Sequence, residues 1–270
     1  MEYITSSDFH FKDTAVALGK FEGIHRGHQL LMDEVKKQEL HGLRSVVFTF
    51  DRPTRLTLTG DTEYKQIYTK KERREILEKR GIDILIEHPF TKEFAALTPD
   101  RFIREVLVEK VGAKVIVVGT DFHFGKNRSG SITDLEKLEE ECGYHLIVVE
   151  KLQLNGKDIS STRIRASLEK GAMEEAKALL GRNYSVSGEI LHGNALGRTI
   201  QVPTINQQVP SFKLLPPNGV YVSKIHWKDE VYYGITNIGT KPTVNNTSEK
   251  TVETNIFDSV SYTHLRAHET

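Results

Sequence analysis

Residues 14–28 read Thr-Ala-Val-Ala-Leu-Gly-Lys-Phe-Glu-Gly-Ile-His-Arg-Gly-His. The first five form a short apolar run, which is typical of a strand buried on both faces, and Gly19 marks its end. Beyond the turn, Leu30, Leu31 and Val35 recur at helical spacing. A buried strand that runs through a glycine-rich turn into a helix predicts an α/β fold.

The same alternation continues to residue 149. Further strands are expected at 45–50, 82–86, 114–118 and 145–149, and further helices at 70–79, after Thr98-Pro99 and near 132–141. Strands separated by helices predict a mainly parallel sheet with helices on both faces. Such sheets bind ligands at the carboxyl ends of their strands.

After Leu180 the pattern changes to short β-like segments at 184–190, 219–226 and 231–237, separated by stretches rich in Gly, Pro and Asn. This texture predicts a second, antiparallel β domain. We expect one domain over 1–181, a second over 182–258, and a separate tail over 259–270.

The charges balance, because Lys plus Arg and Asp plus Glu each number 37 among 270 residues. A net charge of zero gives no general attraction for nucleic acid or anionic membranes. The single cysteine, Cys142, excludes an internal disulfide and fits a reducing compartment. With neither a secretory signal nor an apolar run of about 20 residues, we expect a cytoplasmic protein, and nothing indicates an obligate protein partner.

The turn at residues 19–28, called here the histidine loop, has the chemistry of a phosphate site. Gly19, Gly23 and Gly27 let the backbone approach an anion closely, and the following helix presents free N–H groups to it. His25 and His28 can place imidazole N–H donors on phosphate oxygens and can add positive charge during transfer. The alternative is an ordinary glycine turn with two surface histidines.

This loop resembles the Gly-x-Phe-Asp-Gly-x-His-x-Gly-His signature of bacterial FAD synthetases, a branch of the HxGH nucleotidyltransferases. The resemblance implies a Rossmann-like domain that transfers AMP from ATP to FMN, with Mg²⁺, giving FAD. It also implies catalytic roles for His25 and His28 and substrate binding by Gly19, Phe21 and Gly27. Glu22 stands where the family usually has Asp.

A second segment, residues 119–130, is similar to the Gly-x-Asp/Asn-Phe-x-Phe-Gly loop of the same family. Asp121 can accept hydrogen bonds from a ribose or help to bind a metal ion, Phe122 and Phe124 can pack on a flat ligand, and Arg128 can bind phosphate. The alternative is a loop whose aromatic side chains plug the end of the sheet.

A third segment, residues 159–165, resembles the Ile-Ser-Ser-Thr-x-Ile-Arg motif that holds ATP phosphates in these enzymes. The resemblance assigns Ser161 and Thr162 to ATP binding and Arg165 to catalysis, although a simple helix cap remains an alternative. Residues 49–53 depart from the family's Thr-Phe-Asp-Pro-His-Pro, because the expected histidine is absent.

Residues 188–206 resemble a riboflavin kinase, with a glycine-rich flap and a Pro-Thr-Ala-Asn motif in which Ile205 replaces Ala. The resemblance implies nucleotide binding by Gly193 and Gly197, and Mg²⁺ binding by Thr204 and Asn206. The alternative is a β-turn and loop in a small barrel.

Residues 251–258 still look like a family strand, whereas 259–270 match nothing expected. We therefore expect an incomplete β-barrel that lacks the family's proposed glutamate base, with Glu253 as the nearest substitute, and doubtful phosphorylation of riboflavin.

Two other functions stay open. Pantetheine-phosphate adenylyltransferases and cytidylyltransferases share the two-histidine motif, and a nucleotide-binding regulator without turnover is also consistent with these residues. Formation of FAD from FMN and ATP would distinguish the three.

Overall fold

The structure is a computed structural model that describes residues 1–53, 60, 63–191, 204–227, 230–242 and 248–257. By its internal contacts the chain divides into two compact units. The first comprises residues 1–64, 68–164 and 178–182, and the second comprises 65–67, 165–177 and 183–270.

The first unit contains a six-stranded parallel sheet in the order β1-β4-β3-β2-β5-β6. The strands are β1 (Glu2–Ile4), β2 (Thr14–Leu18), β3 (Arg44–Phe50), β4 (Ile84–His88), β5 (Ala113–Gly119) and β6 (His145–Val149). All five residues of β2 are buried, as expected for a central strand covered on both faces. The predicted parallel α/β architecture is confirmed.

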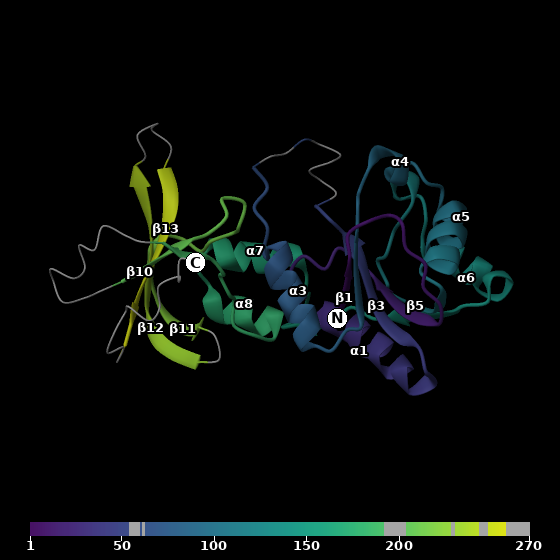
Figure 1. Ribbon diagram of the computed structural model, residues 1–270, viewed down its shortest axis with the longest axis horizontal. Helices are drawn as coiled ribbons and strands as arrows, with labels where there is room; N and C mark the ends of the chain where they lie inside the picture. The colour runs from purple at the N-terminus through teal and green to yellow at the C-terminus, as the bar shows by residue number, and fades with distance from the viewer. Residues whose placement is uncertain (54–59, 61–62, 192–203, 228–229, 243–247, 258–270) are drawn as a thin grey trace, which may run out of the picture. The chain divides into compact units, whose positions relative to one another are not determined.

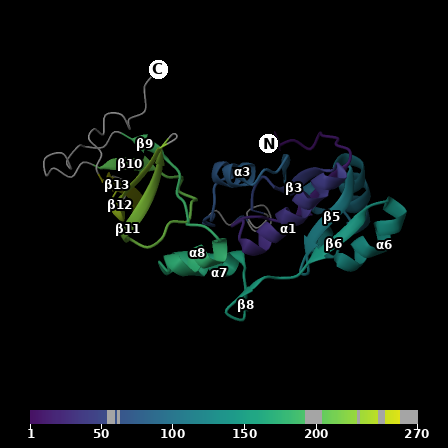
Figure 2. The ribbon, with the colours of Figure 1, turned by 90° about the horizontal axis from the view of Figure 1, so that it is seen from below.

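Helices cover both faces of this sheet, as Figures 1 and 2 show. The helical segments that follow in the chain are α1 (Arg26–Lys37), η1 (Gln38–His41), α3 (Lys70–Lys79), α4 (Lys92–Ala95), α5 (Pro99–Arg101), η2 (Phe102–Lys110), η3 (Lys126–Arg128) and α6 (Ile132–Cys142). Alternate β2 residues divide between the two cores. Ala15 and Ala17 pack with side chains of α1 and α3, whereas Val16 and Leu18 pack with η2 and α6.

Several elements differ from the sequence prediction. The strand β1 was not predicted, and it pairs with β4 at the edge of the sheet. The fourth strand begins at Ile84 and ends at His88, two residues later than expected. The helix after Pro99 continues as a π-helix over Phe102–Lys110.

Beyond the sheet, a short hairpin of β7 (Gln153–Leu154) and β8 (Lys157–Asp158) precedes α7 (Ser161–Glu169) and α8 (Met173–Leu180). The second unit then forms the predicted antiparallel sheet, in the order β11-β12-β13-β10-β9. Its strands are β9 (Glu189–Leu191), β10 (Ile205–Gln208), β11 (Gly219–Trp227), β12 (Glu230–Pro242) and β13 (Ser248–Ile256). The antiparallel class is confirmed.

A chain of hydroxyl groups crosses the middle of the second sheet. Ser223 donates to Thr236 Oγ1 at 2.7 Å, and the hydroxyls of Thr236 and Thr254 lie 2.8 Å apart. Thr254 is buried, so its bond satisfies a polar group removed from water. On the opposite face of the sheet, Val220 and Val222 are exposed.

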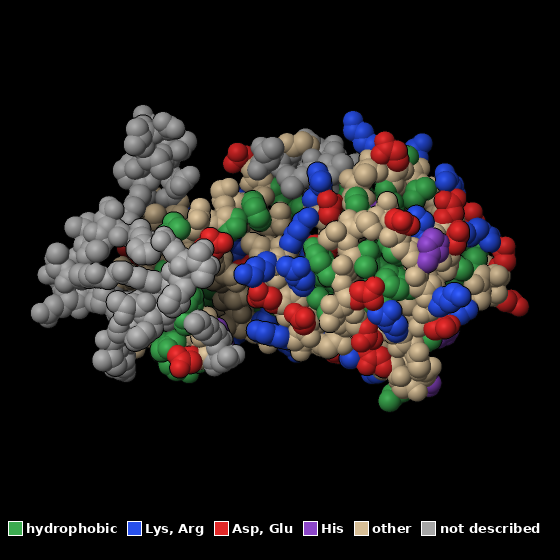
Figure 3. Space-filling model, in the orientation of Figure 1, with side chains coloured by type: hydrophobic (Ala, Val, Ile, Leu, Met, Phe, Trp, Pro, Cys, Tyr) green, Lys and Arg blue, Asp and Glu red, His purple; other side chains and the backbone are tan. Residues whose placement is uncertain are grey.

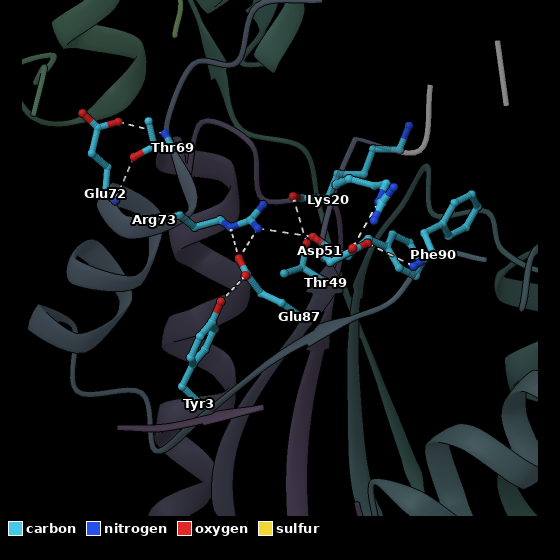
Figure 4. Close-up of polar contacts among 11 residues, drawn as sticks. Tyr3, Lys20, Thr49, Asp51, Thr69, Glu72, Arg73, Glu87 and Phe90 are labelled. Carbon is cyan, nitrogen blue, oxygen red and sulfur yellow. Dashed lines mark hydrogen bonds and ion pairs between the residues drawn. The ribbon is translucent and has the colours of Figure 1, made fainter. Parts of the chain in front are cut away.

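A buried carboxylate ties the end of β4 to the end of β3 (Figure 4). Glu87 has no exposed surface, accepts from Tyr3 Oη at 2.5 Å, and forms an ion pair with Arg73, whose Nε lies 2.9 Å away. Arg73 also donates to the carbonyl of Phe50 at 3.2 Å. Burial, followed by the bond to Glu87, raises the pKa of Tyr3 to about 12. This network holds the strand end that faces the histidine loop, since Thr49 donates to the carbonyl of Lys20 at 3.0 Å.

Removing only one partner of the Arg73–Glu87 ion pair should destabilise the fold. Arg73→Met leaves the buried Glu87 without its cation, so the free energy of unfolding should fall by about 3–5 kcal/mol. Arg73→Met combined with Glu87→Gln should lose less than the sum of the two single changes. Urea unfolding of all four proteins measures this coupling.

Arg101→Met is the control, because Arg101 pairs with Glu105 on an exposed helix face, where the loss of an ion pair changes the free energy of unfolding little. Equal losses for Arg73→Met and Arg101→Met would contradict the role given to the buried pair.

Candidate nucleotide-binding site at the carboxyl edge of the sheet

The histidine loop leaves the sheet at the carboxyl end of β2 and enters α1. Gly19 N donates to the carbonyl of Phe48 in β3 at 3.3 Å, so the loop starts against the neighbouring strand. His25 is the N-cap of α1, and α1 begins at Arg26. The predicted strand, turn and helix are all present, and the free N–H groups of the helix lie where the loop ends.

His25 and His28 form a stacked pair, with ring centroids 3.6 Å apart and an angle of 15° between the planes. His25 Nδ1 accepts from the backbone N–H of His28 at 3.2 Å. An Nδ1 that accepts carries no hydrogen, so a neutral His25 holds its proton on Nε2 and can donate from there. His28 Nδ1 is buried and has no hydrogen-bond partner among the described residues.

The surroundings keep this histidine pair neutral. The pKa of His25 is lowered to about 4, mainly by burial and next by the charge of Arg182, while Asp121 opposes the shift. For His28, burial is again the largest cause of a pKa well below the usual value, followed by His25 and Arg182. At neutral pH the two rings therefore offer uncharged hydrogen-bond donors. The expectation that they add positive charge during transfer stays a prediction.

The loop backbone is strained on either side of Gly23. Phe21 and Ile24 have φ values of 44° and 41°, in the left-handed region that L residues rarely adopt. Each such residue costs about 1–3 kcal/mol and keeps its conformation only where the surrounding contacts enforce it. Both side chains are fully buried, and a Cβ at Gly27 would lie 3.3 Å from the ring of His25. Packing and a close approach therefore fix the shape of the loop.

Glu22, which stands in place of the family's Asp, reaches the hydroxyl of Tyr64 at 2.8 Å. The longer side chain thus has a partner within the first unit. Asp51, at the end of β3, accepts from the backbone of Phe90 at 3.1 Å and binds the turn after β4.

The aromatic loop after β5 closes on itself through backbone bonds between Phe124 and Gly130. Phe124 is buried in the core and acts as an aromatic plug, with the half-buried Phe122 stacked 5.5 Å from it. Asp121 is exposed and pairs with Lys151 at 3.1 Å, and Arg128 is exposed with a φ of 58°. Substrate contacts by Asp121, Phe122, Phe124 and Arg128 stay predictions.

Ser161 and Thr162 open the helix α7, as predicted. Ser160 Oγ accepts from Arg163 N at 3.3 Å, so the cap is supplied by Ser160. Within the second unit, Arg165 donates to the carbonyl of Lys65 at 2.6 Å. The phosphate contacts predicted for Ser161, Thr162 and Arg165 stay predictions.

In the second unit, Asn206 lies in β10 directly opposite Glu253 of β13. Thr204 precedes β10 by one residue. Gly193 and Gly197 lie outside the described residues, as does the tail from 258 onward. The register thus places Glu253, the nearest substitute for the missing glutamate, beside Asn206, a predicted Mg²⁺ ligand.

Two basic residues near the histidine loop were missed. Arg182, taken from sequence only as a domain boundary, donates to carbonyls of the loop. Lys20 has its pKa lowered by burial and by the charge of Arg128, with Glu22 opposing. Arg182 lies 158 and 159 positions from Ile24 and Gly23, and contacts between residues so far apart leave no local signal in the sequence.

The face of the first unit drawn in Figure 3 mixes acidic and basic side chains without a large patch of one sign. Within the described part of the chain, no three His, Cys, Asp or Glu residues cluster as a metal site. Among the same residues, no helix is both long and apolar enough to cross a membrane.

Comparisons with known proteins agree with this geometry. Residues 8–163 match a family model described as FAD synthetase, and residues 180–267 match one described as riboflavin kinase. A protein of Bacillus subtilis (strain 168) named bifunctional riboflavin kinase/FMN adenylyltransferase is 36% identical over 250 residues, covering 91% of this chain and 78% of the relative. The protein of that name from Buchnera aphidicola subsp. Acyrthosiphon pisum (strain APS) is 35% identical, covering 91% and 79%.

A crystal structure from Streptococcus pneumoniae, titled as a macrolide-efflux protein, superposes with a TM-score of 0.86 at 30% identity. It covers 97% of this chain, and the match covers 86% of that protein.

The neutral histidine pair predicts an acid-sensitive fold. In the unfolded chain His25 binds a proton below about pH 6.5, whereas in the folded chain it does so only below about pH 4. The free energy of unfolding therefore falls as the pH falls from about 6.5 to about 4. His25 alone should contribute a loss of about 3 kcal/mol. Urea unfolding of the wild type and His25→Gln at several pH values between 7 and 4 measures this slope, which the variant should reduce.

His41→Gln, which removes an exposed histidine, is the control and should leave the slope unchanged. Identical slopes in the wild type and His25→Gln would contradict the neutral pair.

Proposed function

The chain belongs to the family of bifunctional riboflavin kinase/FMN adenylyltransferases, and on that premise we propose that its first unit transfers AMP from ATP to FMN, giving FAD and pyrophosphate. One observation carries the proposal: two neutral, stacked imidazoles at the N-terminus of a helix that starts from the carboxyl edge of a parallel sheet. This is where α/β proteins bind nucleotide phosphates.

The reaction needs no protein nucleophile. A phosphate oxygen of FMN attacks the α-phosphorus of ATP, the bond from that phosphorus to the oxygen bridging to the β-phosphate breaks, and pyrophosphate leaves with the electron pair. The protein must hold two anions in line and stabilise the negative charge that develops on the phosphate oxygens. The Nε2–H of His25, an N–H of His28 and the free amides of α1 are suitable donors.

Other residues complete the proposed site. Ser161 and Thr162 lie in the first turn of α7, where backbone N–H groups are free to bind ATP phosphates. Arg128 supplies a guanidinium group for the same anions, and the catalytic role of Arg165 is proposed from its place in the 159–165 motif. Asp121 is assigned to the nucleotide, Phe122 and Phe124 to the flat ring system, and Gly19, Phe21 and Gly27 to the shape of the loop.

Magnesium is part of the proposal. With no described cluster of three acidic, histidine or cysteine ligands, the ion in the first unit would be held mainly by the substrate phosphates, a common arrangement for Mg²⁺. In the second unit, Thr204 and Asn206 offer the hydroxyl and amide oxygens that this ion accepts. The ion would neutralise phosphate charge.

We also propose that the second unit phosphorylates riboflavin with ATP, giving the FMN that the first unit uses. The support is the register that sets Glu253 opposite Asn206, which places a carboxylate, the kind of group that can accept the proton of the riboflavin hydroxyl, beside a predicted Mg²⁺ ligand. The sequence alone made this activity doubtful, so the purified chain supplied with riboflavin, ATP and Mg²⁺ decides: FMN formation supports the proposal, and almost no FMN supports the earlier expectation.

A cytoplasmic location and activity without an obligate protein partner complete the proposal. Both fit an enzyme whose substrates, ATP, FMN and riboflavin, are small molecules. Purified protein incubated with FMN, ATP and Mg²⁺ should release FAD and pyrophosphate. Turnover with pantetheine phosphate or CTP instead would favour another HxGH enzyme, and no turnover with any of them would favour a regulator.

His28→Ala should lower the rate of FAD formation by about 10²–10³, because it removes a donor at the position where charge develops. The rate is measured by chromatography of FAD under saturating FMN and ATP. His41→Ala is the matched control and should keep the wild-type rate, because His41 is an exposed residue at the end of η1. A wild-type rate in His28→Ala would refute the role of the pair.

Glu253→Gln should separate the two activities. Formation of FMN from riboflavin should fall by about 10²-fold or more, since general base catalysis typically contributes that much. Formation of FAD from FMN should be unchanged in the same preparation, which serves as its internal control. Unchanged FMN production would rule out Glu253 as the base.

A further inference from the structure

The histidine loop needs an external restraint at the point where it turns. Ile24, at a φ of 41°, is followed directly by His25, so a relaxation at Ile24 would reorient the helix cap. A strained residue keeps its conformation only where contacts enforce it. The carbonyls of Gly23 and Ile24 lie in this turn and accept hydrogen bonds from outside the loop.

Arg182 supplies most of those bonds. Its Nη2 donates to the carbonyl of Gly23 at 2.9 Å, and its Nη1 donates to the carbonyl of Ile24 at 2.8 Å. The planar guanidinium thus grips two successive peptide groups at once, a geometry that a single ammonium cannot reproduce. Gln29 Nε2 adds a second bond to the carbonyl of Ile24, at 3.0 Å.

The residues around Arg182 hold it in place. Gly181 has a φ of 72° and turns the chain after α8, and a Cβ there would lie 3.1 Å from Arg26 Cγ. The guanidinium carbon lies 5.1 Å from the centre of the Tyr68 ring, which stabilises the cation. Leu180 contributes a carbonyl that accepts from Gln29 Nε2 at 2.8 Å.

These contacts use both terminal nitrogens of Arg182 on backbone carbonyls. The side chain is therefore committed to the loop and does not aim at a substrate. We propose that Arg182 is a positioning residue for adenylyl transfer, a role that rests on the proposed function: it holds the carbonyls of Gly23 and Ile24 and so fixes the turn that carries the histidine pair.

Three variants test this role. Arg182→Met keeps the apolar stem without the donors, and its kcat for FAD formation should fall about 10²-fold, as expected when reacting groups shift by about 1 Å. Arg182→Lys keeps the charge but reaches one carbonyl, so its kcat should lie between those of the wild type and Arg182→Met. Gln29→Ala removes one donor to Ile24 and should lower kcat several-fold.

Lys36→Ala is the matched control. Lys36 is also a cation that binds a backbone carbonyl, that of Gly81 at 2.7 Å, but from the far end of α1. Its loss should leave kcat at the wild-type value, whereas a general weakening of α1 would affect both ends of the helix alike.

A second measurement reports on the conformation of the turn and does not depend on catalytic activity. The pKa values of His25 and His28 are followed by NMR of ¹⁵N-labelled protein, with the signals assigned from His25→Gln and His28→Gln. Arg182 and Asp121 are the charged groups that act on His25, and Arg182 and His25 those that act on His28. Arg182→Met should raise both pKa values toward 6.5, because it removes a cation and loosens the turn; Lys36→Ala should raise neither.

The outcomes separate the two proposals. If the wild type forms no FAD, the proposed function fails, and the histidine pKa values of Arg182→Lys, which keeps the cation, still decide whether Arg182 holds the histidine pair, because they rise only if the turn has loosened. If Arg182→Met does not fold, Arg182→Lys decides, since its kcat must then fall below that of the wild type. Wild-type kcat in Arg182→Lys, or wild-type kcat and histidine pKa values in Arg182→Met, would overturn the positioning role.

Discussion

The strand β2 lies between β3 and β5 and runs parallel to both, and the arrangement of the first unit depends on this pairing. Parallel strands send their carboxyl ends to one edge, so the histidine loop after β2 and the aromatic loop after β5 start side by side. Because β2 is buried on both faces, a slip of one residue would exchange the small Ala15 and Ala17 with the larger Val16 and Leu18 between two packed cores. The placement of the loops at that edge is therefore a consequence of core packing.

The electrostatics of the loop follow from the same burial. In a protein with no net charge, the anion site depends on a few local groups. Burial of His25 and His28 makes them neutral donors, while the buried charge of Arg182 lies close enough to depress their pKa values. The fixed positive character of the site then comes from the guanidinium and the helix N-terminus, which need no proton from the solvent.

The sequence predicted most of the parallel sheet because its strands are local, apolar and separated by strong helix signals, as at Thr14–Leu18 and Lys70–Lys79. It missed β1, a three-residue strand that exists only through pairing with β4. The end of β4 was misjudged because Glu87 and His88 are polar by sequence, whereas Arg73 and Tyr3 make burial of Glu87 possible. The histidine pair was found from its motif, but Arg182 and the pairing of Asn206 with Glu253 depend on distant parts of the chain.

The pairing of β1 also sets an order of assembly during synthesis. Glu2–Ile4 leave the ribosome before their partners, Ile84–Ile86, which follow about eighty residues later. Closing so long a stretch of chain has an entropic cost that only later contacts offset, which slows the pairing of distant segments. The β2-α1-β3 segment joins residues that are close in sequence, so it can form before β1 has a partner. The edge strand can thus pair only after β4 has been made, and until it does, the outer side of β4 remains an open edge for the nascent chain.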